Sequence, residues 1–158
     1  MNDATPPAAQ LRTLHDIEAI RRLKASYFAA CDGKDAPGMA ACFAEGEVLI
    51  DYGAVGVFHH RDQLASTFQR LACHPHIVEM HHGANPMIEI VDEHEARGRW
   101  SLHYQQIDMQ ANRLTQLGGR YEDEYRRIAG AWRISRTRFV VDSTLVLDLG
   151  GDAVRRLA

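Results

Sequence analysis

Apolar residues recur every three or four positions between residues 14 and 31, which is the spacing of one helix face. The stripe comprises Leu14, Ile17, Ile20, Tyr27, Phe28 and Cys31. Arg21, Arg22 and Lys24 lie off this stripe or at its margin. Thr13 and Asp16 form a loose capping box at its start. The pair Asp32-Gly33 ends it, with Gly33 expected in the left-handed conformation that often follows a helix. The pattern predicts one long first helix.

Shorter patterns follow this helix. Pro37 suits the first turn of a helix, and residues 37–44 have an apolar side. Residues 47–52 are typical of a strand that ends in a glycine-marked turn, and a brief strand is predicted around residues 57–58. Leu64, Phe68 and Leu71 then recur at helical spacing. The pattern therefore predicts a second and a third helix with two short strands between them.

From residue 76 onward the period of the apolar residues changes to two, as in strands. The predicted strands cover residues 76–91, 95–109, 115–128 and 131–143. The pair Gly118-Gly119 falls inside the third of these strands, where glycines often mark a bulge or bend. Three helices followed by long antiparallel strands indicate the α+β class.

The length of 158 residues fits a single domain with its own core. We expect that domain over residues 11–145, between a flexible tail of residues 1–10 and a C-terminal tail of residues 146–158. Hydrophobic residues make up 46% and charged residues 25% of the chain, which is ordinary for a globular protein. The formal net charge is -3, whereas nucleic-acid-binding proteins usually carry an excess of basic residues.

The three cysteines are odd in number and lack a CxxC spacing, which argues against a disulfide framework and a zinc ribbon. Free thiols fit a reducing compartment. No apolar run is long enough to span a membrane, and the first ten residues lack a signal-peptide pattern. These features predict a cytoplasmic protein with no membrane partner.

Asp32 is a candidate acid at the end of the first helix. On a helical wheel it lies about 40° from Phe28, at the edge of the apolar stripe. A carboxylate at this end faces the negative pole of the helix dipole, which is unfavourable. Asp32 is therefore either a pocket acid held there at a cost or a turn residue before Gly33, since Asp-Gly is a common turn pair.

Histidine is the side chain best suited to move protons near neutral pH, and the chain has nine. They cluster at positions 59–60, 74 and 76, and 81–82. Neighbouring residues of a strand face opposite sides, so only one of His81 and His82 can face a pocket. Most of the others are interpreted as exposed or structural.

A metal site is conceivable at His74-x-His76, which could place two imidazoles on one strand face. Pro75 lies between them, however, and no carboxylate or thiol pattern completes the set. We expect no metal. The chain also lacks GxGxxG, Walker A and GxSxG motifs, which disfavours nucleotide-dependent chemistry and serine hydrolysis.

Five tyrosines form the last group of candidates. Tyr27 lies on the apolar stripe and Tyr52 ends a predicted strand. A tyrosine hydroxyl in a pocket can hold or polarise a substrate oxygen. For Tyr121 and Tyr125 we predict ordinary packing, with the hydroxyl at the surface.

Several segments resemble known enzymes. The segments DIEAIRRLK (16–24), YFAACDGK (27–34), MHHGANPMIEI (80–90) and ARGRW (96–100) resemble bile-acid 7α-dehydratases. The segments LGGRYEDEY (117–125) and WRI (132–134) are similar to hexachlorocyclohexane dehydrochlorinases. Both belong, with scytalone dehydratase, to the SnoaL-like group of the nuclear transport factor two-like superfamily, and the resemblance covers roughly residues 14–140. It implies a cone-shaped curved antiparallel sheet, mixed at its edge, around three N-terminal helices and one internal pocket.

The resemblance also implies site residues. Asp32 and His81 match the catalytic Asp and His of these enzymes, and Tyr27 and Tyr52 match pocket tyrosines of the bile-acid dehydratases. Tyr104 stands where those enzymes have a further pocket Asp, and we expect it to bind substrate. Val141 stands where they have an arginine, so these two positions depart from the bile-acid pattern.

The implied activity is a cofactor-independent lyase that performs a dehydratase-type elimination on a hydrophobic small molecule. His81 would remove a proton, Asp32 would stabilise the imidazolium, and no cofactor or metal is required. Two alternatives stay open: an isomerase or cyclase on the same dyad, and a non-catalytic ligand-binding or oxygenase small-subunit-like module. We also expect a homo-oligomer, trimer or dimer, because long strands leave edges that need cover and the resembled dehydratases are trimers.

Overall fold

The computed structural model describes residues 7–150, which form three helices and a six-stranded mixed sheet that does not close. The helices are α1 (Pro7–Asp32), α2 (Ala36–Ala41) and α3 (Arg61–Leu71), with a 3₁₀ turn η1 (Gly53–Val55). The strands are β1 (Leu49–Asp51), β2 (Val57–Phe58), β3 (Ile77–Ile90), β4 (Glu95–Asp108), β5 (Arg113–Ile128) and β6 (Ala131–Asp148). The predicted α+β class is confirmed. No helix in the described part of the chain combines the length and hydropathy needed to cross a bilayer.

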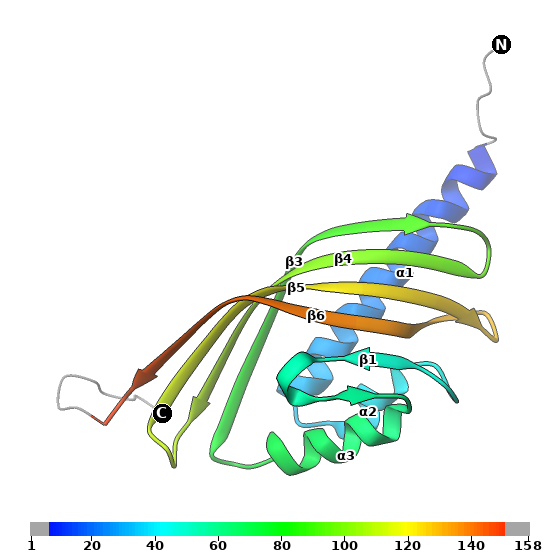
Figure 1. Cartoon of the computed structure of the whole chain (residues 1–158). Coiled ribbons are helices and arrows are strands. Elements are labelled where there is room, and N and C mark those ends of the chain that lie inside the picture. Colours follow the sequence, from blue (N-terminus) through cyan, green and yellow to red (C-terminus); the bar gives the residue numbers. More distant parts are fainter. Residues whose placement is uncertain (1–6, 151–158) are drawn as a thin grey trace.

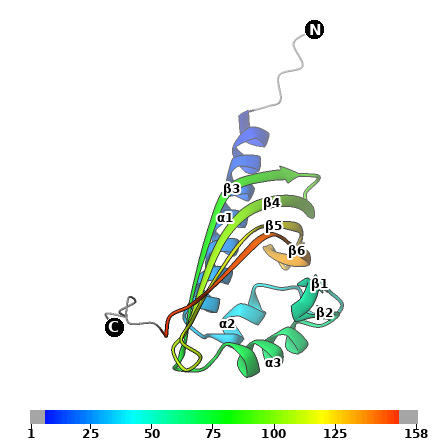
Figure 2. The same cartoon turned by 60° about the vertical axis from the view of Figure 1, so that its left-hand side comes forward.

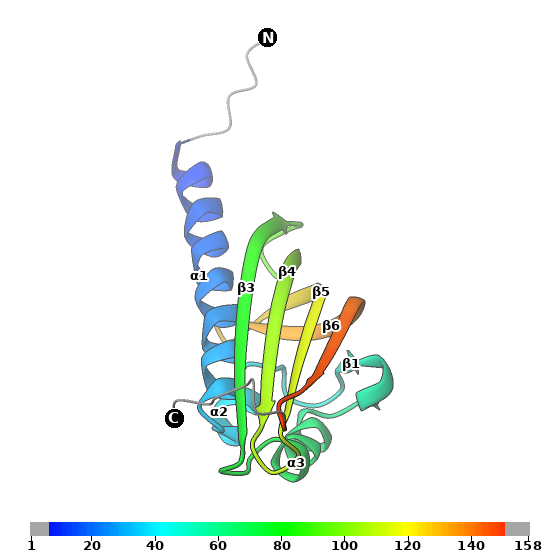
Figure 3. The same ribbon diagram turned by 90° about the vertical axis from the view of Figure 1, so that its left-hand side faces the viewer.

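The strand order is β2-β1-β6-β5-β4-β3. The four long strands form an antiparallel meander, whereas β1 pairs with β6 in parallel, with Ile50 opposite Thr137. Figure 1 shows that these long strands bend together, and that α2, α3 and the β1–β2 hairpin lie beneath the bend. Figure 2 shows the same elements on the concave side of the sheet, and Figure 3 shows α1 running beside the edge strand β3.

The two faces of the sheet follow from the period-two pattern. Along β4, residues 95–102 alternate exposed and buried, and the buried positions include Ala96, Trp100 and Leu102. The buried side receives α1, whose Ile20 is fully buried. The inner face of the sheet therefore holds the core, and the outer face carries charged side chains.

Glycines permit both the bend and the close approach of α1. The register of β5 against β6 shifts between Gly118 and Gly119, as predicted for this pair. A Cβ on Gly119 would lie 2.4 Å from the carbonyl oxygen of Val140. A Cβ on Gly83 would lie 2.2 Å from Cε2 of Phe28. Only glycine allows β3 to pass this close to α1.

Several predicted boundaries need correction. Helix α1 begins at Pro7 rather than near Thr13, because Pro is favoured in a first turn and the two alanines after it are strong helix formers. Strand β6 runs to Asp148, past the predicted end at residue 143, so both predicted tails contain regular structure. Residues 1–6 and 151–158 of those tails lie outside the described residues.

Two local predictions around the ends of α1 and α2 were also wrong. The left-handed residue after α1 is Lys34, with φ of 60°, and not Gly33. Helix α2 ends at Ala41 rather than at residue 44, because Phe43 makes a parallel bridge to Ile134 of β6.

Candidate active site

The end of α1 and the middle of β3 bring Asp32 and His81 together. His81 Nδ1 lies 2.6 Å from Asp32 Oδ1. The backbone N–H of His81 also donates to both carboxylate oxygens of Asp32, each at 3.1 Å. Of the two interpretations of Asp32, the structure supports an acid directed at His81 rather than a residue that only forms the turn.

The partners of His81 determine its protonation pattern. Because an ionised carboxylate only accepts hydrogen bonds, Nδ1 of His81 is the donor, and Nε2 is the basic nitrogen of the neutral ring. Partial burial alone would raise the pKa of Asp32, but the hydrogen bonds from His81, and the charge of that ring when it is protonated, lower it below its ordinary value. Asp32 therefore stays ionised and accepts the hydrogen bond from Nδ1.

Aromatic rings hold the imidazole in place. The ring of Phe28 stacks on His81 with centroids 5.8 Å apart, and Tyr104 meets it edge-on at 4.8 Å. His81 lines a cavity, whereas its neighbour His82 is exposed. The alternation of the strand thus selects His81 as the inward histidine.

This cavity lies on the inner face of the sheet and has a volume of about 790 Å³. Such a volume suits a small organic ligand. Its walls are largely apolar and come from α3, β5 and β6, including Leu64, Phe68, Leu71, Leu117, Phe139 and Val140. Val141, the position where the bile-acid enzymes have an arginine, also lines it. Four of the five site residues predicted from the sequence border the cavity, and the fifth, Asp32, contacts the cavity-lining His81.

Two tyrosines form a hydrogen-bonded pair in the cavity. The hydroxyl oxygens of Tyr27 and Tyr52 lie 2.8 Å apart. Burial raises the pKa of both phenols well above the ordinary value, so both remain protonated. One hydroxyl of the pair donates to the other. Thr137 lies within hydrogen-bonding reach of Tyr52, and Tyr121 lies within reach of Tyr27.

The prediction for the other two tyrosines was wrong. Tyr121 is only 4% exposed, lines the cavity and packs edge-on against Tyr27. Tyr125 is 1% exposed, and its hydroxyl donates to Asp123 and accepts from the indole N–H of Trp100. Both belong to the buried side of β5, where the bend of the sheet encloses them.

Sequence reasoning missed a polar group around Glu79. Glu79 precedes His81 by two residues, lies on the same face of β3 and lines the cavity. Its carboxylate contacts Lys34 Nζ at 2.5 Å and accepts from the hydroxyl of Tyr104 at 2.7 Å. That hydroxyl accepts in turn from Gln106 at 3.1 Å. The period-two spacing from His81 was the signal that could have found Glu79.

A buried ion pair lies beneath the cavity. Lys24 is fully buried, which corrects its predicted position off the stripe or at its margin. Its Nζ lies 2.8 Å from Asp123 Oδ2 and 3.6 Å from the centre of the Tyr121 ring. Burial lowers the pKa of Lys24, and Asp123 opposes that shift. The spacing of four residues from Ile20 and Phe28 was the overlooked signal.

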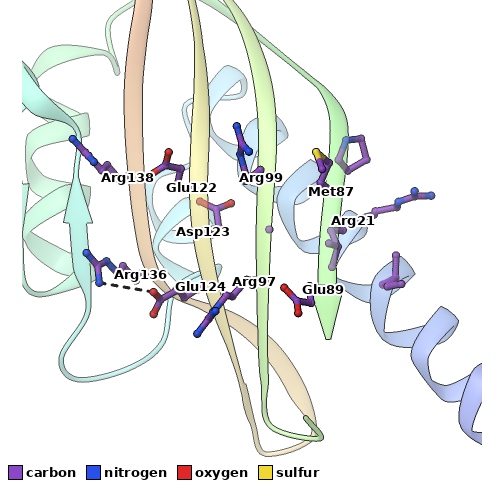
Figure 4. Close-up of a pocket in the computed structure, with 14 residues that line it drawn as sticks. Arg21, Met87, Glu89, Arg97, Arg99, Glu122, Asp123, Glu124, Arg136 and Arg138 are labelled. Atoms are coloured by element: carbon purple, nitrogen blue, oxygen red, sulfur yellow. Dashed lines mark ion pairs between the residues drawn. The ribbon is translucent and has the colours of Figure 1, made fainter. Parts of the chain in front are cut away.

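A second hollow, of about 870 Å³, lies across the outer face of the sheet (Figure 4). The resemblance implied one internal pocket, so this second hollow was not expected. Opposite charges alternate across its strands: in the strand register Glu89 lies opposite Arg97, Arg97 opposite Glu124, and Glu124 opposite Arg136. Because these charges compensate one another and no histidine lines the hollow, the inner cavity is the candidate active site.

The histidines at 74 and 76 stack on each other, with ring centroids 5.3 Å apart. His74 Nε2 contacts the carbonyl oxygen of Arg70 at 2.7 Å. Within residues 7–150, no group of three or more His, Cys, Asp or Glu side chains is arranged to hold a metal ion.

Comparisons with known proteins agree with this architecture. The SnoaL-like domain family matches residues 12–138 of the chain. A protein from Novosphingobium aromaticivorans, provisionally named a scytalone dehydratase, is similar with a TM-score of 0.78 and 23% identity, over 92% of this chain and 95% of that one.

Two further solved structures share the fold. The hexachlorocyclohexane dehydrochlorinase LinA-type3 from Novosphingobium barchaimii is similar with a TM-score of 0.76 and 18% identity, over 87% of this chain and 94% of that one. A protein from Novosphingobium aromaticivorans, provisionally named an aromatic ring hydroxylase, is similar with a TM-score of 0.73 and 18% identity, over 85% of this chain and 93% of that one. At these identities the likeness concerns the fold.

Proposed function

Because the chain belongs to the SnoaL-like domain family, we propose that it is a cofactor-independent lyase, which performs a dehydratase-type elimination on a hydrophobic small molecule. The observation that carries the proposal is the contact of 2.6 Å between His81 Nδ1 and Asp32 Oδ1 beside an apolar cavity. The names of two structural neighbours, a dehydratase and a dehydrochlorinase, support the same class of reaction.

The proposed step begins at Nε2 of His81, which removes a proton from a carbon next to an activating group. The ring becomes an imidazolium, and Asp32 stabilises its charge. The electron pair of the C–H bond forms the new double bond, and a hydroxyl group leaves the neighbouring carbon. Positioned proton transfer of this kind contributes roughly 10²–10⁴ in rate.

The Tyr27–Tyr52 pair assists the departure of the leaving group in this scheme. Since burial keeps both phenols protonated, one hydroxyl of the pair can turn toward the bound substrate and donate a hydrogen bond to the departing oxygen. The proton taken by His81 and the departing hydroxide together make one water. The reaction therefore balances without an oxidant, a reductant or a metal.

The test measures turnover in variants of the dyad, on any substrate found by screening hydroxylated hydrophobic compounds. We expect Asp32→Asn and His81→Ala each to lower kcat by roughly 10²–10⁴. His82→Ala is the matched control, because it removes the neighbouring imidazole from the opposite face of β3. Unchanged turnover in both dyad variants would show that the dyad is not the general base.

The mass of the product separates the lyase from its main alternative. Dehydration removes one water from the substrate, whereas an isomerase or cyclase acting through the same His81 conserves the mass. Mass spectrometry of the product decides between these reactions, and either would leave the role of Asp32 the same.

A further inference from the structure

Three polar groups lie in order along the cavity. Helix α1 and strand β3 run antiparallel: Gly83 is against Phe28, His81 against Asp32 and Glu79 against Lys34. The Tyr27–Tyr52 pair packs on Tyr121, which lies beyond the Gly83 end of this row in the strand register. Two strand residues span about 6.6 Å, so Glu79 lies roughly that far beyond His81. His81 thus lies between the tyrosine pair and the carboxylate of Glu79.

Glu79 is held rigidly but keeps capacity to bind. Lys34 Nζ occupies one carboxylate oxygen, and the hydroxyl of Tyr104 occupies the other. An ionised carboxylate offers about four acceptor positions, so two contacts leave room for a further donor. The side chain is 7% exposed and borders the cavity. A ligand in the cavity can therefore reach an acceptor whose position is already fixed.

Lys34 is placed by the way in which α1 ends. The N–H of Asp35 donates to the carbonyl oxygen of Ala30, and the N–H of Lys34 donates to that of Cys31. This is the common left-handed ending of a helix, with Lys34 at φ of 60°. The ammonium group of Lys34 then contacts Glu79 and compensates its negative charge within the cavity.

We propose that Glu79 determines substrate specificity by accepting a hydrogen bond from a hydroxyl group of the substrate. This inference rests on the proposed function, because it concerns the same cavity. The substrate would be an elongated hydrophobic ring compound with a hydroxyl group at the Glu79 end and the departing oxygen at the tyrosine end. Glu79 and Asp32 disfavour a ligand carboxylate, and Lys34 already compensates Glu79, so a neutral hydroxyl fits better than an ammonium group.

The test compares 2-naphthol with 2-methoxynaphthalene, in which a methyl group replaces the hydroxyl proton, and measures their binding by calorimetry at neutral pH. We expect the wild-type protein to bind the naphthol about tenfold more tightly, as a hydrogen bond to a charged acceptor provides. In Glu79→Gln the preference should fall to about threefold or less, because the amide is a weaker, uncharged acceptor. The double variant Lys34→Met/Glu79→Leu should have no preference, without leaving a lone charge in the cavity.

Glu89→Gln is the matched control, because Glu89 lies on the same strand but on the outer face. It should retain the tenfold preference. The inference is overturned if the wild-type protein binds both probes equally well or binds neither of them. A preference that survives in both Glu79 variants overturns it as well. Because the preference is measured without turnover, it can hold even if the dyad variants show that the proposed reaction is wrong.

Discussion

At the scale of single residues, the close contact between α1 and β3 fixes the positions of the side chains that surround His81. Asp32 ends α1, where a carboxylate is disfavoured by the helix dipole, yet three contacts from His81 hold it there. Phe28 lies one turn earlier and stacks on the same imidazole. The position of His81 therefore depends on how closely β3 approaches α1 at Gly83.

Gly83→Ala tests this close approach. The added Cβ would lie 2.2 Å from Cε2 of Phe28, so the ring or the strand must move. We expect a loss of about 1–3 kcal/mol in the free energy of unfolding, as overpacking of a core gives. Urea denaturation measures it. Phe28→Leu removes the obstructing ring edge, so the double variant should lose less free energy of unfolding than the two single variants together. A Gly83→Ala protein as stable as the wild type would contradict the prediction.

At the scale of elements, the Lys24–Asp123 pair joins α1 to β5 inside the core. Asp123 accepts hydrogen bonds from Thr137 of β6 at 2.6 Å and from Tyr125 at 2.7 Å. Through Lys24 the same carboxylate reaches the helix. One buried acid thus connects three elements beneath the cavity, and the ring of Tyr121 covers the ammonium group.

Lys24→Met should destabilise the protein by about 3–5 kcal/mol, because it leaves the carboxylate of Asp123 buried without its cation. Guanidinium denaturation gives the value. The double variant Lys24→Met/Asp123→Asn removes both charges and should recover part of the loss. If the double variant loses as much as the two single variants together, the two residues act independently and the ion pair is not the cause.

At the scale of the whole molecule, all five tyrosines have a raised pKa, in each case chiefly because of burial. The unfolded chain releases these protons near pH 10, whereas the folded protein retains them. The stability that the neutral phenols contribute is therefore complete below pH 10 and is lost as the pH rises above it.

We expect the ultraviolet absorbance of tyrosinate to appear together with unfolding, in one cooperative transition above pH 10. Circular dichroism recorded on the same samples measures the unfolding. Independent titration of the tyrosines near pH 10 in a protein that keeps its circular dichroism would contradict the prediction.

The exposed apolar side chains in the C-terminal half of β6 indicate that the protein self-associates. Leu145 and Leu147 are exposed by 50% and 43%, and β1 pairs only with residues 136–138 of this strand. Among residues 7–150 no other strand pairs with this edge of β6 beyond residue 138, and an apolar strand with an open edge needs cover. Light scattering should give the mass of a dimer or trimer, and Leu145→Lys should lower it. Leu11→Lys, at an exposed leucine of α1, is the control. A monomeric wild-type protein would refute this prediction.

Periodicity predicted much of the fold, because burial on one side of an element is visible along the chain. The stripe of α1 and the alternation of the long strands indicated the α+β class, and the Gly118-Gly119 pair indicated the bend. Asp32, His81, Tyr27, Tyr52 and Tyr104 came from the resemblance to known families. The left-handed residue at position 34 and the end of β6 were not visible in these patterns.

The sequence by itself thus determined the elements and which face of each is buried. Only the tertiary structure decided which polar groups meet, since Lys34 and Glu79 are 45 residues apart and Asp32 and His81 are 49 apart. Those contacts depend on how α1 docks along β3. The burial of Lys24 and of the Tyr125 hydroxyl was not predicted for the same reason. The pattern along one element shows which side of it is apolar, whereas the partner that makes burial of a charge or a hydroxyl possible comes from another element.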